Sequence, residues 1–461
     1  MRKVFLTVCY AILLTGNLIL TESCKKETLT PPLSENNQWI LDSMKVYYYW
    51  NEQLPKGPAD QEPASSFFRA LLYPEDRFSY LTNPSENKEE YSSFAWYGFE
   101  YALLKDHNTP GALFGTVTLV VPGGPADRQG LKRGDFFTAV NGVLLNETNM
   151  KAAETILRLG NGLQLSMADL ENDTLKNAHI IPLHAEGYIE QPVYISQIFS
   201  SGGRKAGYIF YNQFNGNYDR ELLQRLALMR DKGVTELILD LRYNPGGEIS
   251  TVAKLTGALS RVNANQTFTI YQANRNGGRS EKTFQQVISS NNFIPQLFDE
   301  VAGYRMNVDK VVILTTGSTA SAAELLINNL RPFTNIIQIG TTTMGKDMAS
   351  FAIDDKRDPK RTDIVLHPLI FKLYNALGKG DYNKGLKPDY EIDEFTLLPL
   401  KPFGSAEDPL LAKALEIAGV PSPVVSPLRN KQGKTTRYQP VITSSGDRHS
   451  LPLSVPRTDW K

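Results

Sequence analysis

Cysteine is nearly absent from this chain, which has only Cys9 and Cys24 among its 461 residues. Both lie near the N-terminus, so the rest of the sequence can form no disulfide, no cysteine-based zinc site and no cysteine nucleophile. An excess of one charge is also missing, because 49 Lys and Arg residues balance 49 Asp and Glu residues. Proteins dedicated to nucleic acid normally carry a basic excess, so nucleic acid is not an expected partner.

Histidine is scarce as well, and no histidine lies in a motif typical of a catalytic triad or of a metal site. The sequence therefore predicts neither a metal ion nor another cofactor. The five histidines are His107, His179, His184, His367 and His449. The chain can bury a sizeable hydrophobic core, because 41% of its residues are hydrophobic. Its length allows about two to four domains.

The first 24 residues are typical of a targeting segment. Arg2 and Lys3 precede a mostly apolar stretch over 4–20, which polar residues interrupt and which is short for a membrane span. The segment ends in LTESC, at Cys24, and resembles a bacterial lipoprotein signal whose Cys becomes the lipidated first residue. An ordinary secretory signal with a chance Cys is the alternative. Both interpretations predict export, and the first predicts a lipid anchor in the periplasm or outer membrane of a Gram-negative cell envelope.

Composition and periodicity divide the rest of the chain into four parts. Residues 25–95 have apolar side chains at helical spacing, with a helix candidate over 64–72, and predict a small helical N-terminal domain. Residues 96–190 contain short β-type runs between Gly- and Pro-rich turns. Residues 191–420 alternate strand and helix patterns. Residues 421–461 form a Pro- and Ser-rich basic tail that is expected to be weakly ordered.

The alternation over 191–420 predicts an α/β domain, and the whole chain is therefore expected to be a multi-domain α/β protein. Apolar runs separated by amphipathic helices favour a largely parallel sheet. The expected strands cover 206–211, 236–241, 310–315 and 336–339, and the expected helices cover 219–232 and 322–330.

The β-rich part resembles a PDZ domain, because residues 124–135 read GPADRQGLKRGD, a long and specific match. A PDZ domain captures an extended peptide by adding it as a strand to a sheet edge. The resemblance implies a carboxylate-binding loop at Tyr97, Gly98 and Phe99, where backbone N–H groups can meet a peptide C-terminus. Glu100 comes next, and its carboxylate would oppose that terminus if it pointed inward.

Two segments of the α/β part carry candidate chemistry at helix starts. Residues 239–247 read LDLRYNPGG, and the glycines can present backbone N–H groups to an oxyanion. Taken alone, this segment is better interpreted as a tight strand–helix turn without an active role. Residues 319–324 read TASAAE. Ser321 and Glu324 satisfy a capping box there, and Ser321 is alternatively a nucleophile among helix N–H donors.

A third segment, residues 340–347, reads GTTTMGKD after an expected strand. Lys346 can act as a base only when it is neutral, and burial lowers the pKa of a lysine by up to several units. An exposed turn lysine is the alternative. The segment also fits most of a phosphate-binding P-loop, but that pattern requires Ser or Thr after the Lys, where Asp347 stands here. A nucleotide site is therefore the weaker interpretation.

Together the three segments resemble the carboxy-terminal processing peptidases, also called tail-specific proteases. That family combines a PDZ domain with a crotonase- or ClpP-like α/β domain and uses a Ser–Lys dyad. The resemblance maps the nucleophile to Ser321, its base to Lys346, and the backbone oxyanion donors to Ala322 and Gly247. Many members carry a Gln four residues after the Lys to orient it. This chain has Ser350 at that position, which is a shorter possible orienting group.

The resemblance implies a serine endopeptidase that captures peptides through its PDZ domain and cleaves envelope proteins or peptides through an acyl-enzyme. A catalytically weak or inactive peptide-binding lipoprotein of the same fold is the rival hypothesis, motivated by Ser350 and Glu100. The expected partners are protein or peptide substrates and, through Cys24, a membrane. The oligomeric state is left open.

Overall fold

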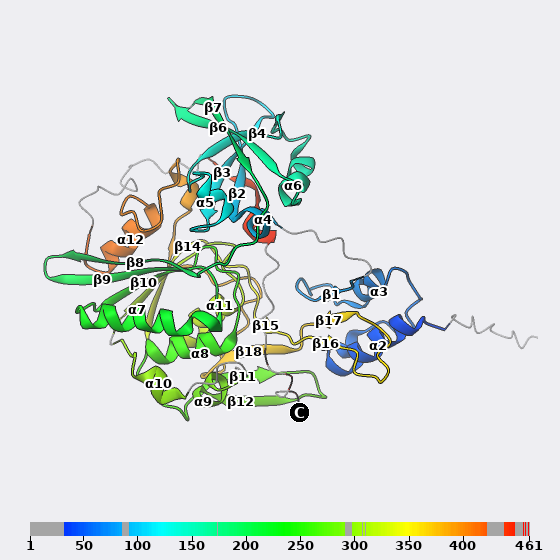
Figure 1. Cartoon of the computed structure of the whole chain (residues 1–461). Helices are drawn as coiled ribbons and strands as arrows, with labels where there is room; N and C mark the ends of the chain where they lie inside the picture. The colour runs from blue at the N-terminus through cyan, green and yellow to red at the C-terminus, as the bar shows by residue number, and fades with distance from the viewer. Residues whose placement is uncertain are drawn as a thin grey trace, which may run out of the picture.

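The computed structural model describes most of the chain (Figure 1). Cys24 and the whole targeting segment 1–24 lie outside the described residues. In the described part, no helix combines the length and the apolar character that a membrane span needs. The described residues are 32–84, 92–172, 174–290, 297–306, 308, 310–421, 438–447, 455, 457 and 460.

A six-stranded, largely parallel sheet lies at the centre of the molecule and confirms the expected α/β class. Its strands are β8 Val193–Ser201, β9 Arg204–Tyr211, β10 Glu236–Asp240, β13 Lys310–Thr315, β14 Asn335–Gly340 and β19 Tyr390–Glu391. In space they follow the order β19-β14-β13-β10-β9-β8. Neighbouring strands from β9 to β19 are parallel, and β8 alone of these six is antiparallel to its neighbour.

Both faces of this sheet are covered by helices. These are α7 Asp219–Asp231, α8 Ile249–Ala258, α11 Ala322–Leu330 and α12 Pro409–Ile417, with short 3-10 turns η2 Gly216–Tyr218 and η3 Glu394–Thr396. Leu237 and Leu239 of β10 face a core shared with α7, α8 and α11, whereas Ile238 faces a second core shared with α12. Strands buried on both faces read as continuous apolar runs, which is why the sequence revealed them.

A smaller antiparallel sheet closes the first of these two cores. Its strands are β11 Thr267–Gln272, β12 Arg279–Thr283, β15 Met348–Ala349 and β18 Phe371–Asn375, in the order β12-β11-β18-β15. Helices α9 Phe284–Ile288 and α10 Phe298–Ala302 pack beside it. Strand β15 begins two residues after Lys346, so this sheet anchors the lysine turn on its C-terminal side.

The N-terminal unit contains a sheet as well as the expected helices. Its elements are α2 Glu35–Tyr47, η1 Asn51–Gln53, α3 Ala64–Leu71, β1 Tyr80–Thr82, β16 Ile353–Asp354 and β17 Val365–His367. β1 pairs with β17, and β17 pairs with β16, although these two strands belong to the α/β part of the sequence. A purely helical unit over 25–95 is thus an incomplete expectation, because the strands that complete its sheet are short and distant along the chain.

The PDZ-like domain lies above the central sheet in Figure 1. Its elements are α4 Ser93–Tyr97, β2 Phe99–Lys105, β3 Leu113–Val120, α5 Pro125–Arg128, β4 Phe136–Val140, β5 Val143–Leu144, α6 Met150–Arg158, β6 Leu163–Glu171 and β7 Thr174–Leu183. The sheet follows the order β20-β2-β3-β4-β6-β7, and β5 pairs with β4. Its edge strand β20, Pro440–Thr443, comes from the C-terminal tail.

The tail is therefore not weakly ordered throughout. Residues 438–447 form β20 and the short 3-10 helix η5, Ser444–Asp447. Tyr438 and Ile442 pack on apolar side chains of the PDZ-like domain, which gives this stretch a tertiary anchor that composition does not reveal. The expectation of weak order is wrong for these residues.

Candidate active site

Ser321 lies where the loop after β13 turns into α11, and its backbone is strained. Its φ is 56° and its ψ is −114°, a conformation that residues other than glycine rarely adopt. The residue is 1% exposed, and among the described residues its Oγ has no hydrogen-bond partner. Because nearly all buried polar groups are hydrogen-bonded, an orphaned hydroxyl in a strained turn indicates a functional role.

The Glu324 carboxylate joins this helix start to the lysine turn. Its Oε2 accepts the backbone N–H of Ser321 at 2.9 Å and that of Lys346 at 2.8 Å. Its Oε1 accepts the N–H of Gly345 at 2.6 Å and the hydroxyl of Thr343 at 2.5 Å. The side chain is fully buried, and burial raises the pKa of its carboxyl while the four donors oppose that shift. One carboxylate thus fixes the two candidate catalytic segments relative to each other.

Lys346 is 3% exposed and lies beneath the N-terminal unit, which excludes an exposed turn lysine. Burial lowers the pKa of its amine to about 8, although two nearby carboxylates act in the opposite direction. Its Nζ lies 5.3 Å from the centre of the Phe78 ring. The guanidinium of Arg77 donates to the carbonyl oxygen of Gly345 at 3.3 Å. Residues from the start of the chain therefore cover the lysine and hold its turn.

The P-loop interpretation of this turn does not fit the fold. A P-loop opens a helix whose N–H groups cradle phosphates, whereas Lys346 leads into strand β15. Asp347 is buried and lies 3.6 Å from Lys372 Nζ, so its carboxylate occupies the position where the pattern needs a hydroxyl. The segment has the spacing of a P-loop without its geometry.

The Asn-Pro-Gly-Gly turn after β10 lies directly against Ser321. Gly246 has a φ of 114°, and a Cβ at this position would lie 2.7 Å from the Cβ of Ser321, so only glycine fits. The Gly246 N–H donates to Asn244 Oδ1 at 2.9 Å and is thereby engaged. Of the two glycines, Gly247 is thus the better candidate for an oxyanion donor, together with Ala322 at the first position of α11.

The Ser–Lys hydrogen bond itself is not formed in this structure, since Ser321 Oγ has no partner among the described residues. Ser350, the possible orienting group, is buried after β15, and its hydroxyl donates to the Phe351 carbonyl oxygen at 3.3 Å. That contact directs Ser350 along its own chain and gives no support to an orienting role. The Glu324 contacts, not Ser350, position the lysine turn.

The expected PDZ loop lies between α4 and β2. Tyr97 and Phe99 have fully buried side chains in the core of the domain, and Gly98 ends α4 with a φ of 74°. The Gly98 N–H donates to the Phe94 carbonyl oxygen at 3.0 Å, and its own carbonyl accepts the Val121 N–H at 2.8 Å, so neither group is available to a ligand. Glu100 is also fully buried, which makes this loop a poor receptor for a second carboxylate.

A cavity of about 650 Å³ borders the lysine turn. The N-terminal unit contributes Trp50 and Phe78 to its wall, and the turn contributes Gly345 and Asp347. The cavity has the size of an ordinary ligand site and lies next to the covered Lys346. Neither Ser321 nor Lys346 is among the residues that line it, so it borders the lysine turn and not the candidate dyad itself.

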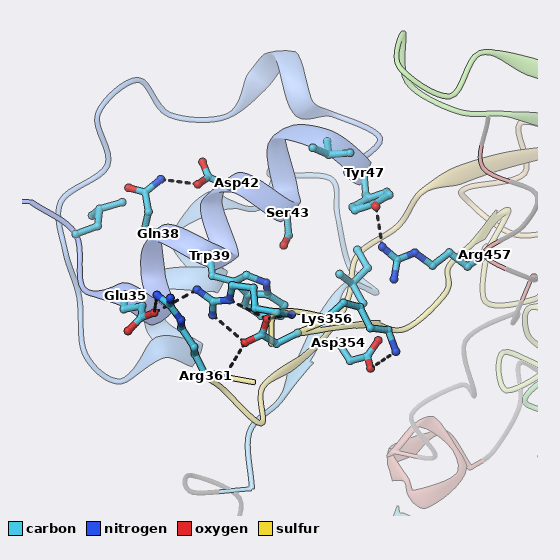
Figure 2. Close-up of a pocket in the computed structure, with 15 residues that line it drawn as sticks. Glu35, Gln38, Trp39, Asp42, Ser43, Tyr47, Asp354, Lys356, Arg361 and Arg457 are labelled. Carbon is cyan, nitrogen blue, oxygen red and sulfur yellow. Dashed lines mark hydrogen bonds and ion pairs between the residues drawn. The ribbon is translucent and has the colours of Figure 1, made fainter. Parts of the chain in front are cut away.

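A second hollow, of about 860 Å³, lies between α2 and the β16 loop (Figure 2). Glu35 pairs there with Arg361 at 2.8 Å and with Arg357 at 3.3 Å, and Arg457 donates to the Tyr47 hydroxyl at 2.9 Å. None of the site residues expected from the sequence is among the residues that line it. We interpret this hollow as part of the packing contact between helix α2 and the segment 353–367.

Family models match all three units of this fold. The model of peptidase family S41 matches residues 205–392, and the model of the peptidase S41 N-terminal domain matches 35–80. A PDZ domain model matches 116–168. The first of these ranges contains Ser321, Lys346 and the Asn-Pro-Gly-Gly turn.

Individual proteins are similar over much of the chain. The carboxyl-terminal-processing protease of Picosynechococcus is 26% identical over 234 residues, 50% of each chain. The carboxy-terminal processing protease CtpA of Bacillus subtilis is 27% identical over 296 residues, 62% of this chain and 55% of its own. The chain thus spans about half the length of these relatives. The crystal structure of a putative S41 protease from Bacteroides fragilis matches with a TM-score of 0.67 and 27% identity, over 83% of this chain and 98% of that one.

Proposed function

Because this chain belongs to peptidase family S41, we propose that it is a serine endopeptidase with Ser321 as nucleophile and Lys346 as base. One observation carries the proposal: Glu324 Oε2 accepts the backbone N–H groups of both residues. The hydroxyl of Ser321 and the amine of Lys346 are both buried, and the pKa of the amine is lowered to about 8. The two segments that carry them are held together by one carboxylate oxygen of Glu324. This pairing of a nucleophile with a base of lowered pKa is the arrangement that nucleophilic catalysis requires.

The reaction follows from these positions. Neutral Lys346 takes the proton of Ser321 Oγ, and Oγ bonds to the peptide carbonyl carbon. The N–H groups of Ala322 and Gly247 stabilise the oxyanion, and one such donor is typically worth roughly 3 kcal/mol. Lys346 then protonates the leaving amine as the C–N bond breaks. Neutral again, Lys346 deprotonates a water molecule, whose oxygen bonds to the acyl carbon. The ester bond to Ser321 Oγ breaks, the acid product leaves, and Lys346 returns the proton to Oγ.

Formation of the Ser–Lys hydrogen bond belongs to the substrate-bound state. Catalytic hydrogen bonds in unoccupied enzymes are often long and tighten when substrate binds. Ser321 Oγ has no partner among the described residues that would hold it back, so rotation of its side chain breaks no hydrogen bond.

The PDZ-like domain is proposed to capture the substrate as an added strand on the edge of β2. The substrates are proteins or peptides in an extended conformation. Because Glu100 is buried at the loop, an internal segment fits this edge better than a free C-terminus.

A peptide-binding protein without turnover is the second candidate. It is favoured by Ser350, which stands where many family members carry an orienting Gln and whose hydroxyl donates to the Phe351 carbonyl oxygen. Fold and peptide capture are the same in both candidates, so only turnover separates them.

Cleavage of casein, an unfolded protein, by the full chain decides between the two. Ser321→Ala and Lys346→Ala should each lower kcat/KM by at least about 1,000-fold, because only binding and oxyanion contacts remain. Lys232→Ala removes a lysine at an exposed position and should leave the rate unchanged. A wild-type rate no higher than that of Ser321→Ala and Lys346→Ala would establish the binding protein instead.

A further inference from the structure

The peptide-accepting edge of the PDZ-like domain is occupied by the chain's own C-terminal segment. β20 pairs antiparallel with β2, with Thr443 opposite Ala102 and Ile442 opposite Leu103. The other edge of β2 is taken by β3. A strand has only two edges, so no further peptide can pair with residues 102–104 of β2 while β20 is in place. Figure 1 shows the red C-terminal segment beside β2 and α4.

Apolar side chains hold the segment on the domain. Ile442 packs against the main core of the PDZ-like domain, and Tyr438, which is 9% exposed, packs edge-on against Phe114 with ring centroids 5.8 Å apart. Val441 on the same strand is 38% exposed. The segment is thus recognised through bulky apolar residues four positions apart.

The segment also reaches the loop that carries the nucleophile. It turns away from β2 at Ser444, whose Oγ accepts the N–H of Tyr101 at 2.8 Å. The next residue, Ser445, shares a hydrogen bond of 2.6 Å with the hydroxyl of Ser318, in the loop between β13 and Ser321. A cavity of about 270 Å³ lies at this contact. Ser318 of the loop and Thr443 of the segment are among the residues that line it. One short stretch therefore connects the peptide edge to the candidate nucleophile loop.

We propose that residues 438–447 are a built-in competitor for the peptide-binding edge, which a substrate must displace before it reaches Ser321. The inference rests on the proposed peptidase function, whose regulation it describes. A segment of the same chain competes at a higher effective concentration than a separate peptide does, because its pairing is intramolecular. A peptide that pairs only weakly with β2 therefore cannot displace residues 438–447. The favoured ligand is an internal, extended protein segment that carries bulky apolar residues four positions apart.

Release of the segment can be tested with one buried and one exposed position on the same strand. Ile442→Asp puts a charge into an apolar contact, whereas Val441→Asp changes an exposed side chain. Both are made in the full chain carrying Ser321→Ala, so that binding is measured without cleavage. The probe is a fluorescent peptide with the sequence of residues 438–447, followed by anisotropy.

Ile442→Asp should bind this peptide at least about tenfold more tightly than its Ser321→Ala parent, because the tethered competitor is gone. Val441→Asp should bind like the parent. Equal affinity of all three proteins overturns the proposal.

An engineered disulfide between β20 and β2, which can be reduced again, gives the opposite test. It does not depend on the fold of the Ile442 variant. Ala102→Cys and Thr443→Cys place thiols at positions that face each other across the two strands. Cys9 and Cys24 are replaced by Ser in the same Ser321→Ala chain. The oxidised protein should bind the peptide at least about tenfold more weakly than the reduced protein. The disulfide holds β20 on β2, so the peptide cannot displace it, whereas in the reduced protein it can. Binding that reduction does not change overturns the proposal.

The two proposals fail separately when Ser321 is intact. Ile442→Asp should then also raise the rate of casein cleavage. If Ile442→Asp opens peptide binding but no protein cleaves casein, the peptidase proposal alone is wrong. If Ser321-dependent cleavage is present but peptide binding is equal in all variants, the competitor proposal alone is wrong.

Discussion

At the scale of single residues, the candidate dyad combines two costly environments. Ser321 has a strained backbone and a buried hydroxyl without a partner among the described residues. Lys346 is an amine removed from water, so its charged form is destabilised. A strained backbone, an unsatisfied hydroxyl and a lowered lysine pKa are each more frequent at functional sites than elsewhere. Their coincidence in two segments held by one carboxylate favours a reactive role for both residues.

The rate of cleavage should rise with pH around the pKa of Lys346. Burial lowers that pKa to about 8, and only the neutral amine can accept the serine proton. At pH 7 roughly one tenth of the amine is then neutral, far more than for a lysine with a pKa near 10.5. We expect kcat/KM to increase about tenfold for each pH unit below about 8 and to level off above it. A flat profile, or a midpoint near 10.5, would contradict Lys346 as the base.

The candidate nucleophile and base could be proposed from the sequence because their motifs are local. TASAAE and GTTTMGKD each contain the candidate residue and the turn that holds it. The residues that cover Lys346 could not be identified from a local motif. Phe78 and Arg77 lie far away along the chain and in no motif, and only the fold brings them to the lysine turn. Glu324 was recognised as a capping residue, but its reach to the turn is a tertiary contact.

At the scale of elements, the start of α11 and the lysine turn depend on the charge of Glu324. The turn directs a hydroxyl and two N–H groups at this carboxylate, and a third N–H comes from Ser321. An amide at the same position would present its own N–H₂ to two of these donors. The two segments would then move apart.

Glu324→Gln should therefore lower kcat at least about 100-fold with little change in KM, since a displacement of about 1 Å at a reacting group has an effect of this size. Glu221→Gln is the matched control, because Glu221 forms only a partly exposed pair with Arg225 on α7. Steady-state kinetics on casein separate kcat from KM. A Glu324→Gln enzyme that keeps its kcat, or that loses activity through KM alone, would show that the carboxylate does not position the dyad.

Long, doubly buried elements were predictable, whereas short edge strands were not. The sequence indicated the strand 310–315 and the helix 322–330, and the structure has β13 Lys310–Thr315 and α11 Ala322–Leu330. By contrast β16 has two residues, and β20 has four in a tail rich in Pro and Ser. Such strands exist only because a partner edge is available, so their own sequence holds little signal.

At the scale of the whole molecule, a buried charge cluster joins the PDZ-like domain to the central sheet. Arg133 of the GLKRGD stretch lies 2.7 Å from Glu394 and donates to the Tyr243 hydroxyl at 2.9 Å. Tyr243 belongs to the turn that carries Gly247. Arg242, on the same turn, pairs with Asp408 at 2.7 Å. The position of the domain is thus linked by charged and polar contacts to the candidate oxyanion donors.

Removing one partner from such a cluster leaves a buried charge uncompensated, which typically costs roughly 3–5 kcal/mol. Arg133→Met should therefore lower the midpoint of thermal unfolding by several degrees and loosen the docking of the PDZ-like domain. Limited chymotrypsin digestion should then cut after Tyr188, in the connection 184–192 between β7 and β8. Lys105→Met is the matched control, because Lys105 is exposed in the same domain and pairs with Glu147 at the surface, away from this connection. If Arg133→Met unfolds and is digested like Lys105→Met, the cluster does not hold the domain. If it is digested at 184–192 while casein cleavage is unchanged, docking of the domain is not linked to the Gly247 turn.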